Sequence, residues 1–164
     1  MKIDFTELLK AQKELDQVII GDKKIENLTE KKLVALSIEL AELFNEIRCF
    51  KYWSNKGMSK KSVILEELVD VLHFWLSLMN DDDEINEKEK LELTSCCEMD
   101  INLTYLHMID CIGSYKIEGY CDYLCEYMEC LLMIAKDLNF TIAEIIEAYY
   151  RKRDINFKRQ QEGY

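Results

Sequence analysis

The sequence predicts an all-α protein, a helical bundle of five to six helices in one domain that spans residues 1–164. The chain has no proline and only five glycines, whereas β sandwiches and barrels need both residues in their turns. Apolar residues recur at helical spacing through most of the chain, and no segment alternates with period two for long enough to indicate a sheet. These observations favour helices that each bury one apolar face.

The first two expected helices lie in the N-terminal third of the chain. Residues 4–20 have apolar side chains at helical spacing, and Gly21 ends that pattern. After a polar stretch, Thr29 is expected to cap a second helix that runs through LVALSIELAELFNEIRCFKYW, ending at Trp53. A loop rich in serine and lysine follows, so the next helix has to begin near residue 60.

Four further segments complete the expected bundle. A third helix covers about 60–80, and the acidic run at 81–90 is interpreted as a solvated connection or a helix start. Residues 87–112 and 117–138 are expected to form two helices separated near Gly113.

The last helix has a clear start signal. Thr141 and Glu144 form a predicted capping box, and the helix is expected to continue through AYYRKRDINFKRQQ.

Charge and cysteine content restrict the function and location of the protein. The chain has 21 Lys+Arg and 32 Asp+Glu, a net charge of −11, which speaks against a nucleic-acid-binding protein. We find no signal peptide and no apolar run of membrane-spanning length, so a cytoplasmic protein without membrane contact is expected. The seven cysteines are therefore interpreted as reduced, mostly buried thiols. Cys121, Cys125 and Cys130 lack the spacing of zinc ligands.

Two carboxylate pairs are the strongest chemical signal. Glu39 and Glu42 lie three residues apart on the second helix, and Glu67 and Asp70 have the same spacing on the third, with 24 residues (43–66) between the pairs. Both pairs have apolar neighbours, and burying four negative charges is costly without a cation. Mg²⁺ prefers such oxygen ligands. The alternative is that both pairs are ordinary surface residues on solvated helix faces and bind no metal.

The C-terminal helix has a complementary cationic stripe. Lys152, Asn156 and Arg159 fall on one helix face. Such a stripe suits phosphate oxygens. Alternatively, these basic residues only complement the helix dipole.

Taken in order, these segments resemble a known family. E-x-x-E, 24 residues and E-x-x-D is similar to the metal-binding signature of the all-α nucleoside triphosphate pyrophosphatases, the MazG-like superfamily. Within it, LLKAQKELD, IELAELFNEIRCFKYW, EELVDVLHFWLSL and YRKRDINFKRQQEGY resemble segments of the dimeric dUTPases, including bacterial and phage forms. The resemblance begins near residue 8 and reaches residue 164, and the middle of the chain contributes little to it.

The resemblance implies a metal site and a base site. Glu39, Glu42, Glu67 and Asp70 would be the Mg²⁺ ligands, and one glutamate of the first pair would also orient the attacking water.

For the base site, Gln12 and Asp16 match positions that contact the base. Gln12 offers both a donor and an acceptor; the alternative is an ordinary exposed helix residue.

Further residues are assigned by the same resemblance. Trp53 matches an aromatic position near the base, where it would stack; without the family it would be assigned to the core, as would Phe50. Lys152, Asn156 and Arg159 would bind the phosphate chain, and Tyr164 would close over the nucleotide. His73 is interpreted as a packing residue near the ligands, because imidazole is a poor Mg²⁺ ligand.

The implied activity is a Mg²⁺-dependent dUTP diphosphatase. It would hydrolyse dUTP to dUMP and pyrophosphate, and it would also hydrolyse dUDP. This activity limits uracil in DNA and supplies dUMP. A homodimer is expected. Two positions depart from the family pattern: Asp16 stands where many relatives have Asn, and Arg153 where Asn is frequent. Asp16 leaves dCTP as an alternative substrate. A non-catalytic helical interaction protein is the alternative of a different class.

Overall fold

Six helices and one two-stranded sheet make up the part of the chain that the computed structural model describes, residues 1–82, 85, 90–96 and 98–163. The elements are β1 (Lys2–Asp4), α1 (Thr6–Ile20), α2 (Leu28–Ile47), α3 (Lys61–Met79), β2 (Glu92–Thr94), α5 (Ile101–Glu118), α6 (Cys121–Asp137) and α7 (Ile142–Gln161). The all-α fold class predicted from the sequence is confirmed.

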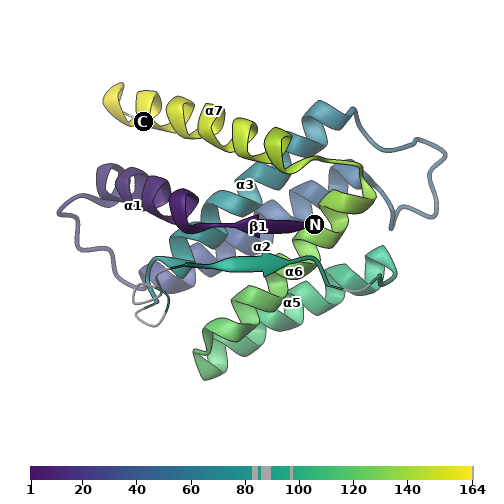
Figure 1. The fold of residues 1–164 in the computed structure, drawn as a ribbon, viewed down its shortest axis with the longest axis horizontal. Helices are drawn as coiled ribbons and strands as arrows, with labels where there is room; N and C mark the ends of the chain where they lie inside the picture. Colours follow the sequence, from purple (N-terminus) through teal and green to yellow (C-terminus); the bar gives the residue numbers. More distant parts are fainter. Residues whose placement is uncertain (83–84, 86–89, 97, 164) are drawn as a thin grey trace.

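Helix α3 lies at the centre and contacts α1, α2, α6 and α7. In Figure 1, α7 and α1 lie above the small sheet and α5 lies below it, while α6 rises from the lower part of the view toward the start of α7. Trp75 of α3 is fully buried, and its Nε1 donates a hydrogen bond to the Leu124 carbonyl of α6 at 2.7 Å. Its ring also packs at 4.9 Å from Phe5. Because α3 is apolar on most of its surface, it can be covered on several sides.

Helices α2 and α3 form an antiparallel pair. Near the start of α2, Lys32 Nζ donates to the Ser77 carbonyl at 3.1 Å, close to the end of α3. Near the end of α2, the Glu46 carbonyl accepts from the Ser59 N–H at 2.9 Å, just before α3 begins. The middle of α2 therefore faces the middle of α3, where the predicted carboxylate pairs lie.

The boundaries of α2 differ from those expected. The N-cap is Asn27 rather than Thr29, and the helix ends at Ile47 rather than at Trp53. Arg48 adopts a left-handed conformation with φ of 65°, which stops the helical hydrogen-bond pattern. The aromatic residues that follow consequently lie in a loop.

The expected helix at 87–112 is wrong in its first part; residues 87–89 lie outside the described residues. Strand β2 pairs antiparallel with β1, and Ile3 lies opposite Leu93. Leu91 and Leu93 are both buried. Three-residue strands have too little alternation for a period-two signal, and their pairing joins segments distant in sequence.

The expected break at Gly113 is also wrong. Helix α5 continues to Glu118 and ends at Gly119, whose φ of 78° only glycine adopts easily. A glycine inside a helix costs about 1 kcal/mol relative to alanine, and here the buried Met108 and Cys111 of the same helix pack in the core.

The predicted capping box at the start of α7 is confirmed. Thr141 Oγ1 accepts from the Glu144 N–H at 3.2 Å, and Glu144 Oε2 accepts from the Thr141 N–H at 2.7 Å. Lys61 Nζ donates to Glu144 at 2.9 Å, and this hydrogen bond is the first cause of a Glu144 pKa lowered to about 2. The contact fixes the start of α7 beside the start of α3.

The described residues contain most of the cysteines and no helix that could span a membrane. Six of the cysteines lie in this part of the chain. Three are buried (Cys111, Cys121 and Cys130) and three are half-buried (Cys49, Cys96 and Cys125). Cys97 lies outside the described residues. In the same part of the chain, no helix combines the length and apolar character needed to cross a membrane.

Candidate active site

Three of the four predicted metal ligands converge between α2 and α3. Glu39 comes from α2, and Glu67 and Asp70 lie one helical turn apart on α3. One carboxylate oxygen of each lies within 4.8 Å of the others, and all three residues are half-buried. We call these residues the carboxylate cluster. Their convergence follows from the antiparallel pairing of the two helices.

The electrostatics of the cluster are unfavourable without a cation. The pKa of Glu39 is raised to about 7, first by burial and then by the charges of Asp70 and Glu42. Burial and the charge of Asp70 raise the pKa of Glu67 as well. Glu42 lies outside the closest set, and its charge raises the pKa of Glu39 and Glu67, which places it beside the cluster. Half-buried carboxylates that repel one another form a site suited to a positive ligand.

The cationic stripe of α7 faces this cluster. Lys152 Nζ donates to Asp70 Oδ2 at 2.7 Å, and both side chains are mostly shielded from solvent. The positive charge of Arg159 also lowers the pKa of Asp70, although burial raises it overall. Asn156 lines the neighbouring cavity. The structure therefore brings the predicted phosphate-binding residues and the predicted metal ligands to one site.

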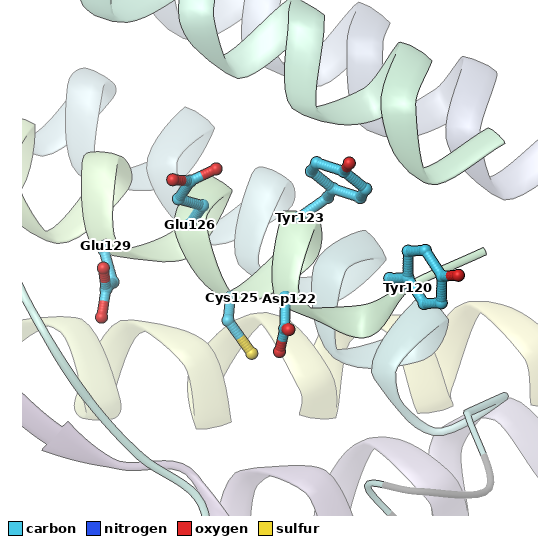
Figure 2. A pocket seen from close by; sticks show the side chains of 6 residues that line it. All are labelled: Tyr120, Asp122, Tyr123, Cys125, Glu126 and Glu129. Atoms are coloured by element: carbon cyan, nitrogen blue, oxygen red, sulfur yellow. The ribbon is translucent and has the colours of Figure 1, made fainter. Parts of the chain in front are cut away.

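A cavity of about 200 Å³ adjoins the cluster, and Asp70 borders both. Its apolar walls come from α1, α3 and the segment before α2. Its polar lining consists of Gln12, Asp16, Lys32, Asp70, His73, Ser77 and Asn156. A larger cavity of about 430 Å³ lies along α6 (Figure 2), but none of the predicted site residues lines it. The smaller cavity is therefore the one with the expected chemistry.

Gln12 is the centre of a hydrogen-bond network in this cavity. Its Nε2 donates to Asp16 Oδ1 at 2.8 Å, and its Oε1 lies 2.8 Å from His73 Nδ1 and accepts from the Tyr149 hydroxyl at 3.1 Å. Only 3% of Gln12 is exposed, so the alternative of an ordinary exposed residue is wrong. Because Oε1 already accepts from two groups, Gln12 offers the cavity its second N–H, a donor.

His73 is a neutral part of the same network. Burial is the main cause that lowers its pKa to about 4, and its ring stacks on Tyr149 with centroids 4.4 Å apart. With Nδ1–H donating to Gln12, Nε2 is an acceptor, and among the described residues it is one of three buried polar side-chain atoms without a hydrogen-bond partner. The imidazole thus fixes the orientation of Gln12 and lines the cavity.

Phe74, Ser77 and Lys32 line the cavity although sequence reasoning did not assign them to it. Phe74 and Ser77 follow Asp70 by four and seven residues, the spacing of one helix face, which could have identified them. No spacing in the sequence indicated that Lys32 would line the cavity. It is only 6% exposed and donates to both carboxylate oxygens of Asp81, at 2.8 and 2.7 Å. Asp81 is itself exposed, as expected for a solvated acidic run, and it also pairs with this buried lysine.

Trp53 and Phe50 are exposed, so the alternative that assigned both to the core is wrong. Trp53 is 65% exposed and Phe50 is 42% exposed, and their rings contact each other in the loop after α2. Within the described chain, neither residue lines the cavity around Gln12. The stacking prediction for Trp53 stays a prediction, and Tyr164 lies outside the described residues.

Arg153, which stands where Asn is frequent in the family, contacts α1. Its Nε donates to the Ala11 carbonyl at 3.1 Å, and its guanidinium pairs with Glu14 at 2.5 Å. These bonds join α7 to α1 on the side of the cavity formed by α1.

Comparison with known proteins bears on this site directly. A family model described as dUTPase matches residues 4–164, almost the whole chain. The chain belongs to the dUTPase family. As a dUTPase it is an enzyme that hydrolyses dUTP, which fits the all-helical fold and the meeting of carboxylates, cationic residues and a cavity. A search of curated proteins gave no match.

Proposed function

We propose that this dUTPase is a Mg²⁺-dependent diphosphatase that converts dUTP to dUMP and pyrophosphate, and that also accepts dUDP. The observation that supports it is the shared border at Asp70 between the carboxylate cluster and the cavity that contains Gln12. A nucleotide needs both parts side by side, because its base and its phosphates are joined through one sugar.

The donor set fits Mg²⁺. All three cluster residues offer oxygen atoms, and the raised pKa of Glu39 reflects repulsion and burial that a hard divalent cation would relieve. Glu39, Glu67 and Asp70 would hold the metal. Bound there, Mg²⁺ would neutralise phosphate charge and increase the acidity of a coordinated water.

Glu42 is our candidate for the residue that orients the attacking water. It was predicted as the fourth metal ligand, but it lies beside the cluster without belonging to its closest set, so we propose the water-orienting role for it instead. A carboxylate in that position can accept a hydrogen bond from water and then its proton. A Glu42→Gln variant should therefore bind Mg²⁺ and dUTP but lose turnover.

The α7 residues would bind and position the phosphate chain. Lys152 holds Asp70 at 2.7 Å in the ligand-free chain. When a cation neutralises Asp70, the ammonium group can turn to a phosphate oxygen a short distance away. Arg159 and Asn156 would add a bidentate donor and a neutral donor on the same helix face.

Gln12 and Asp16 would recognise the base. The second N–H of Gln12 is a donor, and Asp16 adds an acceptor next to it. This pair matches the O4 and N3–H of uracil, and equally the N3 and amino group of cytosine. The family assignment favours uracil, and a nucleotide panel separates the two bases.

A homodimer remains part of the proposal. Val34, Ile38 and Ala41 lie on one face of α2, and the first two are about half exposed. An apolar groove of about 340 Å³ adjoins this face, lined by Ala41, Phe44, Phe50, Asn102, Tyr105 and Leu106. Apolar surface of this extent is typical of a protein interface. We propose that a second copy covers it; Ile38→Glu should then yield monomers in light scattering. A cytoplasmic location stays a prediction.

The direct test is pyrophosphate release from dUTP, dCTP, dTTP and UTP, each with Mg²⁺ and with EDTA. Metal-dependent release from dUTP alone supports the proposal. Release from dCTP at a comparable rate would move the base assignment to cytosine and leave the metal site intact. A folded protein inactive on every nucleotide would favour the non-catalytic alternative.

A further inference from the structure

A second cluster of ligating side chains lies between α5 and α6, remote from the active site. His107 and Cys111 are four residues apart on α5, and Glu126 comes from the facing side of α6. Cys111 Sγ lies 3.8 Å from His107 Nε2 and 3.9 Å from Glu126 Oε2, and His107 Nε2 lies 3.9 Å from Glu126 Oε2. Three donor atoms from two helices thus form a nearly equilateral triangle.

The size of this triangle suits a small divalent cation. Zn–S bonds of about 2.3 Å and Zn–N or Zn–O bonds of about 2.0–2.2 Å place tetrahedral donor atoms about 3.3–3.6 Å apart. The observed separations exceed this by only a few tenths of an ångström. Side-chain rotation alone can close such a difference, since His107 and Glu126 are partly exposed.

The donor types select the metal. One imidazole nitrogen, one thiol sulfur and one carboxylate oxygen form a borderline donor set typical of Zn²⁺. Mg²⁺ requires oxygen ligands and would not bind a thiolate. The cluster therefore differs in chemistry from the carboxylate cluster and shares no helix with it.

The surroundings leave room for a fourth ligand. Cys111 is buried, whereas Glu126 also lines the 430 Å³ cavity along α6. In Figure 2, Glu126 points away from Cys125 and Glu129, which lie on another face of the same helix. Water can thus reach the cluster from the side of Glu126 while the sulfur stays sheltered.

We propose that His107, Cys111 and Glu126 bind one Zn²⁺ ion per chain, with water as the fourth ligand. On binding, the Cys111 thiol loses its proton to solvent and the sulfur forms a bond to the metal. The ion joins α5 to α6 and stabilises this helix pair. It takes no part in dUTP hydrolysis, because none of its ligands borders the cavity around Gln12.

The test uses the full-length protein with excess Mg²⁺, so that oxygen-only sites are occupied. Co²⁺ is added as a spectroscopic probe, followed by competition with Zn²⁺. The expected result is a thiolate-to-cobalt charge-transfer band at one equivalent per chain, displaced by Zn²⁺, and a Tm that Zn²⁺ raises by several degrees. Cys111→Ser should abolish the band. Removing even outer-shell partners of a metal costs about 10–100-fold in affinity, so His107→Gln and Glu126→Gln should each weaken binding at least about 100-fold.

Two matched controls lie on α6, the helix of Glu126. Cys125→Ser and Glu129→Gln should keep the band, the affinity and the Zn²⁺-dependent Tm. The partly exposed positions 107 and 126 keep the test decisive if Cys111→Ser fails to fold. Absence of the band in the wild-type protein would overturn the proposal. So would a band that needs Cys111 but keeps full affinity in both His107→Gln and Glu126→Gln, since this would be binding by a lone thiol.

Discussion

The carboxylate cluster and the His107–Cys111–Glu126 cluster have similar geometry and opposite chemistry. Each set of three donor atoms lies within 4.8 Å across a pair of packed helices. The first offers only oxygen and gathers like charges, so burial and repulsion raise the pKa of Glu39 to about 7. The second combines nitrogen, sulfur and oxygen. Donor type, rather than spacing, therefore decides which cation a helix pair can hold.

The largest expected effect comes from removing an oxygen ligand at the first cluster. Glu67→Gln should lower kcat for dUTP by at least about 10³-fold, because the loss of charge stabilisation in phosphoryl chemistry amounts to several kcal/mol. Steady-state pyrophosphate release checks this, and far-UV circular dichroism checks the fold. Glu66→Gln is the matched control: this exposed neighbour on α3 should stay within about threefold of wild type. Comparable losses in both variants would mean that the cluster has no special role.

A second prediction concerns Mg²⁺ and the Lys152 ammonium group, which compete for Asp70. Lys152→Met should lower kcat/KM for dUTP about 10²-fold, the usual cost of losing one donor to a developing charge. The same change should tighten Mg²⁺ binding in the absence of nucleotide, because the ammonium group 2.7 Å from Asp70 no longer competes. Calorimetric titration with Mg²⁺ measures this, with Lys158→Met as a control on the exposed side of α7. Weaker Mg²⁺ binding in Lys152→Met would contradict the competition.

The pKa of Glu39 predicts a pH dependence for the first cluster. With a pKa of about 7 in the metal-free protein, Glu39 is protonated below that pH, and Mg²⁺ has to displace the proton. Mg²⁺ affinity should therefore fall by up to about tenfold per pH unit below 7 and level off above it. Titrations at pH 6 and pH 8 test this. Glu39→Gln should bind weakly at both values, without that dependence on pH between them.

The smallest effect concerns stability without metal. The folded-state pKa of Glu39 is higher than its ordinary value of 4.5, so its ionisation destabilises the fold increasingly from pH 4.5 to 7 and fully above pH 7. In EDTA at pH 8, Glu39→Gln should raise the free energy of unfolding by about 1 kcal/mol, allowing for solvent screening of this half-buried group. Urea unfolding measures it. Glu126→Gln should not raise the free energy of unfolding. An equal increase in both variants would show that the effect is not specific to the carboxylate cluster.

The sequence predicted the first cluster and missed the second for physical reasons. Glu39 and Glu42 share one helix face, as do Glu67 and Asp70. The apolar neighbours of both pairs indicated that the two helices would face each other. His107 and Cys111 also share a helix face, but Glu126 joins them only because α6 folds back on α5. That turn lies at Gly119 and not at Gly113, where a break was expected.

The network around Gln12 shows the same limit. Gln12 and Asp16 lie one turn apart on α1, a spacing visible in the sequence. Tyr149 lies more than 130 residues away, and its hydroxyl reaches Gln12 only because α7 packs on α1. The donor that Gln12 presents to the cavity could therefore be assigned only from the structure.

We propose that the carboxylate cluster and its neighbouring cavity together hydrolyse dUTP with Mg²⁺. The most direct measurement is product analysis of dUTP turnover during a Mg²⁺ titration from EDTA-treated protein. The expected result is no turnover in EDTA, recovery as Mg²⁺ is added, and dUMP and pyrophosphate in equal amounts. Turnover that persists in EDTA, or release of single phosphates to give dUDP, would contradict it.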